Sequence, residues 1–171
     1  MFKSAKVFAG MLAAGAMAIG AASAQAQTPT RIGEFNDWGS FSYDSGGGKV
    51  CYALSVPTAK QPANVDHGDN FFLVTQRARQ NVTYEPQFMA GYTLQEGSKV
   101  TVVIDGQSFT LFTKENSAWV ENAAQEPALV AAMKAGSRMS VKAKSRRGTD
   151  TSYEYSLSGV TAALNAIQNC N

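Results

Sequence analysis

The sequence contains few of the residues that most often carry chemistry. Its 171 residues include one histidine, His67, and two cysteines. A zinc site needs several His or Cys ligands, and residues 64–70 do not match the D-x-[DN]-x-[DN]-G pattern of a calcium loop. Residues 25–171 also contain no G-x-S-x-G and no S-x-x-K motif. The sequence therefore predicts no metal, no cofactor and no catalytic residue.

Charge of either sign is also scarce, at 16% of residues, and the formal net charge is +2. Lys3 and Lys6 account for this excess, because they are the only charged residues among the first 24 and leave 13 basic and 13 acidic residues in 25–171. A nucleic-acid-binding domain is expected to carry a clustered excess of basic residues. The composition therefore argues against nucleic acid as a partner, and an aromatic content of 10% argues against a disordered chain.

The N-terminus has the pattern of an export signal. Lys3 and Lys6 precede an uncharged, apolar run over 7–22, and small residues then fit A-x-A cleavage after Ala24 or Ala26. A transmembrane anchor is the alternative, but an anchor needs about 20 strongly apolar residues. This run is shorter and rich in Ala and Gly, so it favours a signal peptide.

The chain is predicted to have three parts, of which cleavage removes the first. These are a signal peptide (1–24), a flexible leader (25–34) and a single domain (35–171). No later segment is apolar enough to span a membrane. The expected location is therefore periplasmic, associated with the outer membrane, or secreted.

Cys51 and Cys170 are the only cysteines. An even number of cysteines in an exported protein favours a disulfide. The alternatives are a redox pair, which is usually spaced C-x-x-C, and two free thiols. We expect a structural disulfide that ties the C-terminus to the second predicted strand.

Hydrophobic periodicity predicts a mainly β domain. Apolar residues alternate with period two in short segments that turn signals separate. Asp105-Gly106 is a strong hairpin signal, and a two-residue turn there pairs Val102 with Phe109 and Val100 with Leu111, on one apolar face. Alternation over 49–56 places Cys51 opposite the larger residues. The predicted strands lie at 35–43, 49–56, 71–78 and 85–92, in the 99–113 hairpin, and at 139–144 and 153–157.

Two short helices complete the predicted fold. One is expected over 123–135, before Gly136, with Pro127 tolerable only near its first turn. The other is expected over 159–169, with Ser158 as its cap and an apolar stripe of Val160, Leu164 and Ile167. Seven or so short strands with two short helices, one of them C-terminal, favour an antiparallel β-sandwich.

Four motifs follow one another along the chain, before the terminal Cys170. They are KVCYAL (49–54), EGSKVTVVIDG (96–106), LVAAMKAGS (129–137) and YSLSG (155–159). In this order the chain resembles the invasion-associated locus B family of exported bacterial proteins. The resemblance implies a periplasmic or envelope-associated sandwich of immunoglobulin-like build. Some members of that family are linked to host-cell invasion, and no catalytic motif is part of its pattern.

The strongest local charge signal is a basic segment at 142–147. Lys142 and Lys144 project from one face of a predicted strand, and Arg146 and Arg147 follow at its turn. We predict a basic edge that binds a partner, either an envelope or host-surface protein or an anionic glycolipid. The alternative is an edge strand whose charges discourage pairing with other sheets.

These observations favour a non-enzymatic, exported interaction domain that contributes to host-cell invasion or envelope integrity. One alternative is a periplasmic hydrolase with a site near His67, and another is a purely structural envelope component. His67 itself is expected in a solvated, turn-forming loop, because its neighbours are Asn, Asp and Gly residues.

Overall fold

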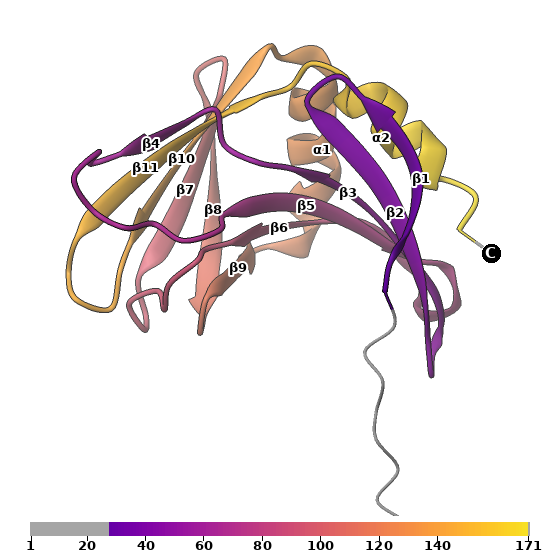
Figure 1. Ribbon diagram of the computed structural model, residues 1–171, viewed down its shortest axis with the longest axis horizontal. Coiled ribbons are helices and arrows are strands. Elements are labelled where there is room, and N and C mark those ends of the chain that lie inside the picture. The colour runs from indigo at the N-terminus through magenta and orange to yellow at the C-terminus, as the bar shows by residue number, and fades with distance from the viewer. Residues whose placement is uncertain (1–27, 171) are drawn as a thin grey trace, which may run out of the picture.

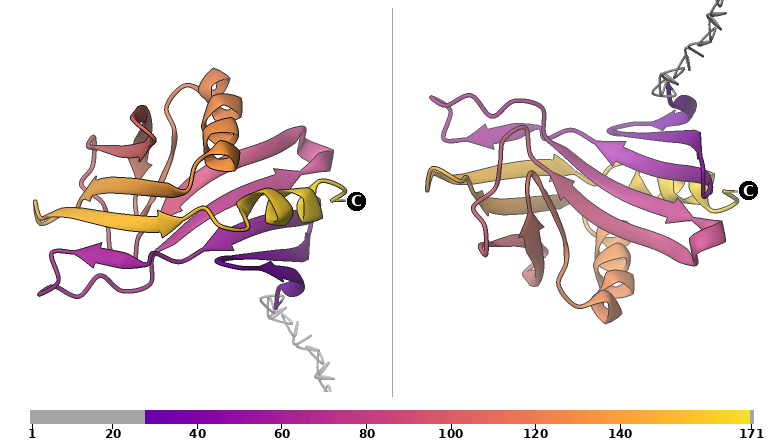
Figure 2. Two further views of the ribbon diagram at one scale, coloured as in Figure 1. Left: turned by 90° about the horizontal axis from the view of Figure 1, so that it is seen from above. Right: turned by 90° about the horizontal axis from the view of Figure 1, so that it is seen from below.

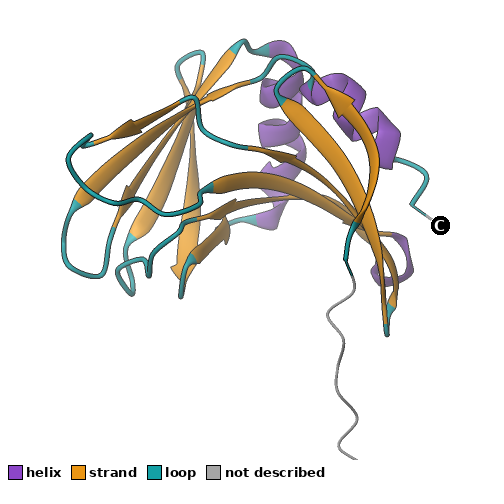
Figure 3. Cartoon of the chain, viewed as in Figure 1, coloured by secondary structure: helices purple, strands orange, loops and turns teal. Residues whose placement is uncertain are grey.

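A computed structural model describes residues 28–170, so the predicted signal peptide and its two cleavage sites lie outside the described residues. The described chain forms an eleven-stranded antiparallel sheet with two α-helices (Figures 1 and 3). None of the helices within this part is long and apolar enough to cross a membrane. The strands are β1 (Thr30–Phe35), β2 (Trp38–Ser45), β3 (Gly48–Ser55), β4 (Ala59–Gln61), β5 (Phe71–Arg77), β6 (Val82–Met89), β7 (Lys99–Ile104), β8 (Gln107–Lys114), β9 (Ser117–Val120), β10 (Arg138–Lys144) and β11 (Asp150–Ser156), and the helices are α1 (Glu126–Ala135) and α2 (Val160–Ile167).

The sheet is bent so that its two halves pack against each other. Its strand order is β1-β2-β3-β5-β6-β9-β8-β7-β10-β11-β4. Phe72 on β5 lies 6.0 Å from Tyr155 on β11, and Phe88 on β6 lies 5.4 Å from Tyr153, measured between ring centroids. The predicted mainly β, antiparallel fold with two short helices is confirmed. The two layers of the predicted sandwich are halves of one continuous sheet.

The β7–β8 hairpin has the predicted register. Val102 pairs with Phe109 and Val100 with Leu111, and all four side chains are buried. The turn residues Asp105 and Gly106 have φ angles of 47° and 82°. Positive φ at both central positions is the turn geometry whose twist matches that of paired strands, which explains why this dipeptide sets the register.

Strand β3 shows the predicted alternation, and its small residues are the ones that face the core. Cys51, Ala53 and Ser55 are buried, whereas on the opposite face Val50 is buried and Tyr52 and Leu54 are half-buried. Helix α2 packs on β1, β2 and β3 from the inner side. Small side chains on the inner face let the helix come close to the strands, so the larger ones lie on the outer face.

The N-terminal part of the domain differs from the prediction. Residues 30–35 form β1, which pairs with β2, so the predicted leader over 25–34 is wrong for its last five residues. The predicted strand over 35–43 is likewise interrupted by a turn, because Asn36 has a φ of 52°. Asparagine tolerates this left-handed conformation better than most residues, and the chain reverses there to make a hairpin.

Both predicted helices are present, and their starts are different. A short 3-10 helix, Ala123–Gln125, precedes α1, and Pro127 lies in the first turn of α1. Helix α2 buries the predicted stripe of Val160, Leu164 and Ile167. Its N-cap is Gly159, one residue later than the predicted Ser158. Gly159 has a φ of 92°, and a Cβ there would lie 1.8 Å from the Phe35 carbonyl oxygen. Only glycine fits this close approach.

Candidate functional site

The structure pairs Cys51 with Cys170 and places the bond at the end of the molecule where α2 covers the sheet. Their Cα atoms are 5.8 Å apart, within the usual range for a disulfide. Both residues are 3% exposed. This burial and the separation of 119 residues suit a structural bond that holds the last helix on β3.

His67 is buried, so the prediction of a solvated loop position is wrong for this side chain. The residue is 6% exposed. Its Nδ1 lies 2.9 Å from the Tyr153 hydroxyl on β11, and its Nε2 lies 2.9 Å from the Pro62 carbonyl oxygen. The polar composition of segment 64–70 suggested solvent exposure, but the segment folds over β11 and turns its one ring inward.

Asn70 holds this loop in place. Its Nδ2 donates to the carbonyl oxygens of His67 and Gly68 at 2.9 and 3.0 Å. Its Oδ1 accepts from the Gly91 amide at 3.3 Å. A buried side chain thus satisfies main-chain groups that a loop would otherwise expose to water, and it joins the 62–70 loop to the loop that follows β6.

A chain of hydrogen bonds continues from His67 toward the surface. The Tyr153 hydroxyl donates to the Tyr92 hydroxyl at 2.9 Å, and Tyr92 lies 2.6 Å from the Thr151 hydroxyl. Thr151 in turn donates to the Ala143 carbonyl oxygen at 3.2 Å. Burial, and then the hydrogen bond with Tyr92, raise the pKa of Tyr153 far above its ordinary value. This hydroxyl therefore stays protonated and remains a donor.

The chain leads to a pocket of about 460 Å³ that three separate segments line. These segments are 65–67, which includes His67, then Tyr92 and Thr93 in the loop after β6, and finally the β10–β11 turn with the start of β11, which contribute Ser145, Arg146, Arg147, Thr149 and Thr151. The Arg146 amide donates to the Thr93 carbonyl oxygen at 2.9 Å, and the Gln95 amide donates to that of Lys144 at 2.9 Å. The turn is therefore held against the second loop by main-chain bonds.

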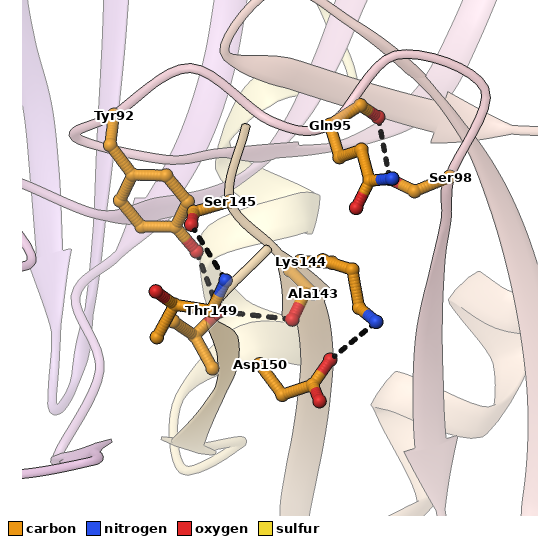
Figure 4. A network of polar contacts seen from close by, with 9 residues as sticks. Tyr92, Gln95, Ser98, Ala143, Lys144, Ser145, Thr149 and Asp150 are labelled. Carbon is orange, nitrogen blue, oxygen red and sulfur yellow. Dashed lines mark hydrogen bonds and ion pairs between the residues drawn. The ribbon is translucent and has the colours of Figure 1, made fainter. Parts of the chain in front are cut away.

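The β10–β11 turn is also braced from within (Figure 4). The Ser145 amide donates to the Thr149 carbonyl oxygen at 2.9 Å, and the Thr149 amide donates to the Ser145 hydroxyl at 3.1 Å. Gly148 completes the turn with a φ of 87°. Because these groups already have partners, the turn can hold a ligand mainly through its side chains.

The four predicted basic residues do not form one surface. Lys142 and Lys144 point to the outer face of β10, where the Lys144 ammonium lies 3.2 Å from the Asp150 carboxylate (Figure 4). Arg146 and Arg147 line the pocket, and within residues 28–170 neither has an ion-pair partner. The cluster is thus divided between a sheet face and a cavity wall.

The predicted edge position of the strand that carries Lys142 and Lys144 is wrong, and so is the protected-edge alternative, whereas Arg146 and Arg147 lie at the turn beyond it, as predicted. Strand β10 pairs with β7 on one side and β11 on the other. The edges of the sheet are β1 and β4. The error arose because β10 pairs with β7, a strand distant in the sequence, and no short-range pattern reports this pairing.

The sequence predicted the two arginines of the pocket but not its hydroxyl groups. Tyr153 was expected as a strand residue, and Tyr92, Thr151 and Ser145 carried no signal of a site. Their convergence depends on the way the sheet bends, which no short-range pattern reports. Among residues 28–170, no three His, Cys, Asp or Glu side chains are grouped as ligands for a metal ion.

Comparison with known proteins identifies the family of this fold. The family model described as invasion associated locus B (IalB) protein matches residues 38–168. A search of curated protein sequences finds no match. The crystal structure of invasion associated protein B from Bartonella henselae is similar, with a TM-score of 0.57 and 14% sequence identity over 81% of this chain and 93% of that chain. At this identity the likeness supports the fold.

Proposed function

The chain belongs to the invasion-associated locus B family, and from this premise we propose that it is an exported, non-catalytic recognition domain of the bacterial envelope. Its binding site is the pocket at the β10–β11 turn. The ligand is an anionic group, a phosphate or a carboxylate, carried by a partner in the envelope or on a host surface. Binding of that partner is its contribution to invasion or to envelope integrity.

One observation carries this proposal: two arginines without ion-pair partners among the described residues face a pocket that also contains hydroxyl groups. Arg146 and Arg147 line it together with Tyr92, Ser145 and Thr149. A guanidinium group offers a planar set of donors that matches the two oxygens of a carboxylate or phosphate. Neighbouring hydroxyl groups add donors that a tetrahedral or planar oxyanion can use.

Two features support export. The N-terminal segment has the composition of a signal peptide, and disulfides persist in oxidising compartments such as the periplasm. A buried Cys51–Cys170 bond fits a protein that folds after translocation.

The hydrolase alternative fits the geometry less well. A general base needs a ring nitrogen that can reach a substrate proton. Both nitrogens of His67 are within 2.9 Å of groups in the fold itself. The ring is therefore placed to organise the pocket wall and not to take part in acid–base chemistry at a bound substrate.

Titration of isotope-labelled domain with anions tests the proposal. Inorganic phosphate should shift the amide resonances of 145–149, and lipopolysaccharide micelles should shift the same resonances if the phosphate belongs to a glycolipid. Arg146→Gln/Arg147→Gln should weaken phosphate binding about ten-fold or more, because charge-assisted hydrogen bonds contribute about 1.5–3 kcal/mol each.

The matched control is Lys142→Gln/Lys144→Gln, which removes the same charge from the outer face of β10. It should bind phosphate within about two-fold of the wild type, because these two lysines lie outside the pocket lining and water and salt screen exposed charges. Equal losses in both double variants would show that the whole basic segment acts through its charge and that the pocket is not the site.

A further inference from the structure

We propose that His67 takes up a proton when the pocket binds its anion, so that recognition strengthens as the pH falls. This inference depends on the proposed function for the anion. Its proton-binding part depends on a separate observation, the number of hydrogens available to the hydrogen-bond chain behind the pocket. His67 acts here as a positioning residue, because it lines the pocket wall but its ring nitrogens bond to Tyr153 and to the Pro62 carbonyl oxygen.

The hydrogen-bond chain has five links and ends on a main-chain carbonyl oxygen at both ends. It runs from the Pro62 carbonyl oxygen through His67, Tyr153, Tyr92 and Thr151 to the Ala143 carbonyl oxygen. Each link needs one hydrogen. Each hydroxyl supplies one, and a neutral imidazole supplies one more, so one link stays unmade. An imidazolium carries a second N–H and completes the chain.

The direction of the links gives the same result. A carbonyl oxygen only accepts, so Nε2 of His67 must donate to Pro62. The Tyr153 hydroxyl donates to Tyr92, and its oxygen is then free to accept from Nδ1 of His67. The complete chain therefore needs both ring nitrogens as donors, which is the charged form of histidine, and the neutral ring makes one link fewer.

The charges around the ring explain why the proton and the anion would favour each other. Arg146 and Arg147 line the same pocket as His67, so a positive ring and the two guanidinium groups would repel each other. A bound anion removes this repulsion. Conversely, the charged ring adds a third cation to the pocket wall, and the two binding events are coupled with the same sign.

Other groups near the ring modify this coupling without replacing it. The Asp66 carboxylate accepts from the Gly68 amide at 2.9 Å, and the Lys60 ammonium donates to the Gly68 carbonyl oxygen at 2.8 Å. Asp66 belongs to the 62–70 loop, and Lys60 belongs to β4, which precedes it. The titratable and charged groups on the elements packed around His67 are Lys60, Asp66, Asp69, Tyr92, Arg146, Arg147 and Tyr153.

The experiment uses inorganic sulfate as the probe, because sulfate keeps its charge where phosphate groups titrate. His67 is the one histidine in the sequence, so its ring signal in an NMR spectrum is assigned without further variants. Sulfate affinity should rise at least about five-fold between about pH 8 and pH 5.5, the lower range of typical site-to-site coupling. By reciprocity, saturating sulfate should increase the affinity of the ring for its proton by the same factor, which the ring signal followed against pH measures.

Two variants separate the proton from the fold. His67→Gln stays neutral, so sulfate binding should lose its dependence on pH. Tyr153→Phe keeps the ring but removes the partner of Nδ1, so the dependence of sulfate binding on pH should weaken. Thermal melting shows whether each variant is folded. If one variant does not fold, the pH dependence of sulfate binding in the other variant tests the proposal.

The outcomes distinguish the two proposals. A wild type that binds sulfate equally at both pH values, with an unmoved ring titration, overturns the proton coupling and leaves the anion site standing. A wild type that binds neither sulfate nor phosphate at any pH overturns both. A pH dependence that persists in His67→Gln assigns the proton to another group and overturns the role of His67.

Discussion

At the end of the molecule that carries the C-terminus, α2 lies on β1, β2 and β3 and the Cys51–Cys170 bond holds it there. At the other end, the β10–β11 turn meets the 62–70 loop and the loop after β6 through polar contacts (Figure 2). One end is closed by apolar side chains and a covalent bond. The other is closed by hydrogen bonds between main-chain groups, hydroxyls and one imidazole.

The two kinds of closure differ in how strongly they bind and in what they respond to. Burying a large apolar side chain contributes about 1.5–3 kcal/mol and does not depend on pH. A hydrogen bond contributes a net free energy of only about 1 kcal/mol, and it is lost when a proton is missing. The polar end is therefore the weaker and more adjustable one, and the two arginines that line the pocket lie there.

Removing the disulfide should have the largest effect on stability and little effect on the pocket. Cys51→Ser/Cys170→Ser removes a bond across 119 residues, and we expect a loss of about 4 kcal/mol in the free energy of unfolding. Urea unfolding followed by circular dichroism measures this loss. Sulfate binding at the pocket should stay within about two-fold, because the pocket lies at the opposite end.

Wild-type protein treated with a reducing agent is the matched control. The midpoint of its urea unfolding should coincide with that of the double serine variant. Mass spectrometry of non-reduced peptides should first show Cys51 linked to Cys170. If the serine variant loses sulfate binding while still folded, the two ends are coupled and the comparison between them fails.

Gly159→Ala should give the next largest effect, again at the C-terminal end. A Cβ at this position would lie 1.8 Å from the Phe35 carbonyl oxygen, and the backbone must shift to relieve the clash. We expect a loss of about 2–3 kcal/mol, measured as a shift in the urea midpoint.

Gly97→Ala is the control for backbone conformation alone. Gly97 also has a positive φ, 71°, but nothing lies within 4 Å of a Cβ there. Its substitution should cost about 1 kcal/mol, the price of the left-handed conformation. Equal losses in the two variants would mean that Phe35 moves freely, and that β1 is not closely packed on the start of α2.

Local patterns predicted both helices and eight of the eleven strands, because these elements depend on nearby residues, but they missed β1, β4 and β9. The Asp105-Gly106 turn and the apolar alternation around it determine their register without reference to the rest of the chain. The same holds for the stripe of Val160, Leu164 and Ile167 on α2. Where only a few residues decide the structure, as in β4 and in the turn at Asn36, the pattern was too short to be recognised.

The candidate site was predicted only in part, because it is assembled from distant segments. Arg146 and Arg147 stand out in the sequence as adjacent charges, whereas Tyr92 and Tyr153 look like ordinary strand and loop residues. Their hydroxyls meet only because the sheet bends until β11 faces β5 and β6. His67 was misplaced for the related reason that loop composition reports the average exposure of a segment and not that of one side chain.

Two tyrosines on β11 provide the finest comparison between the polar and the apolar surroundings. Tyr153 and Tyr155 are both fully buried. The Tyr153 hydroxyl bonds with His67 and Tyr92, whereas the Tyr155 hydroxyl has no hydrogen-bond partner within the described residues. Tyr153→Phe should therefore destabilise the protein by about 1–2 kcal/mol, because it leaves buried partners unsatisfied.

Tyr155→Phe should be neutral or stabilising by up to about 1 kcal/mol, since it removes a buried hydroxyl that gains nothing from the fold. The two variants delete the same atom, two residues apart on the same strand, so the loss of volume cancels between them. Urea midpoints at pH 7 measure the difference. If Tyr155→Phe is as destabilising as Tyr153→Phe, the Tyr155 hydroxyl has a partner such as a buried water. The surroundings of the two tyrosines are then equally polar, and the contrast between them fails.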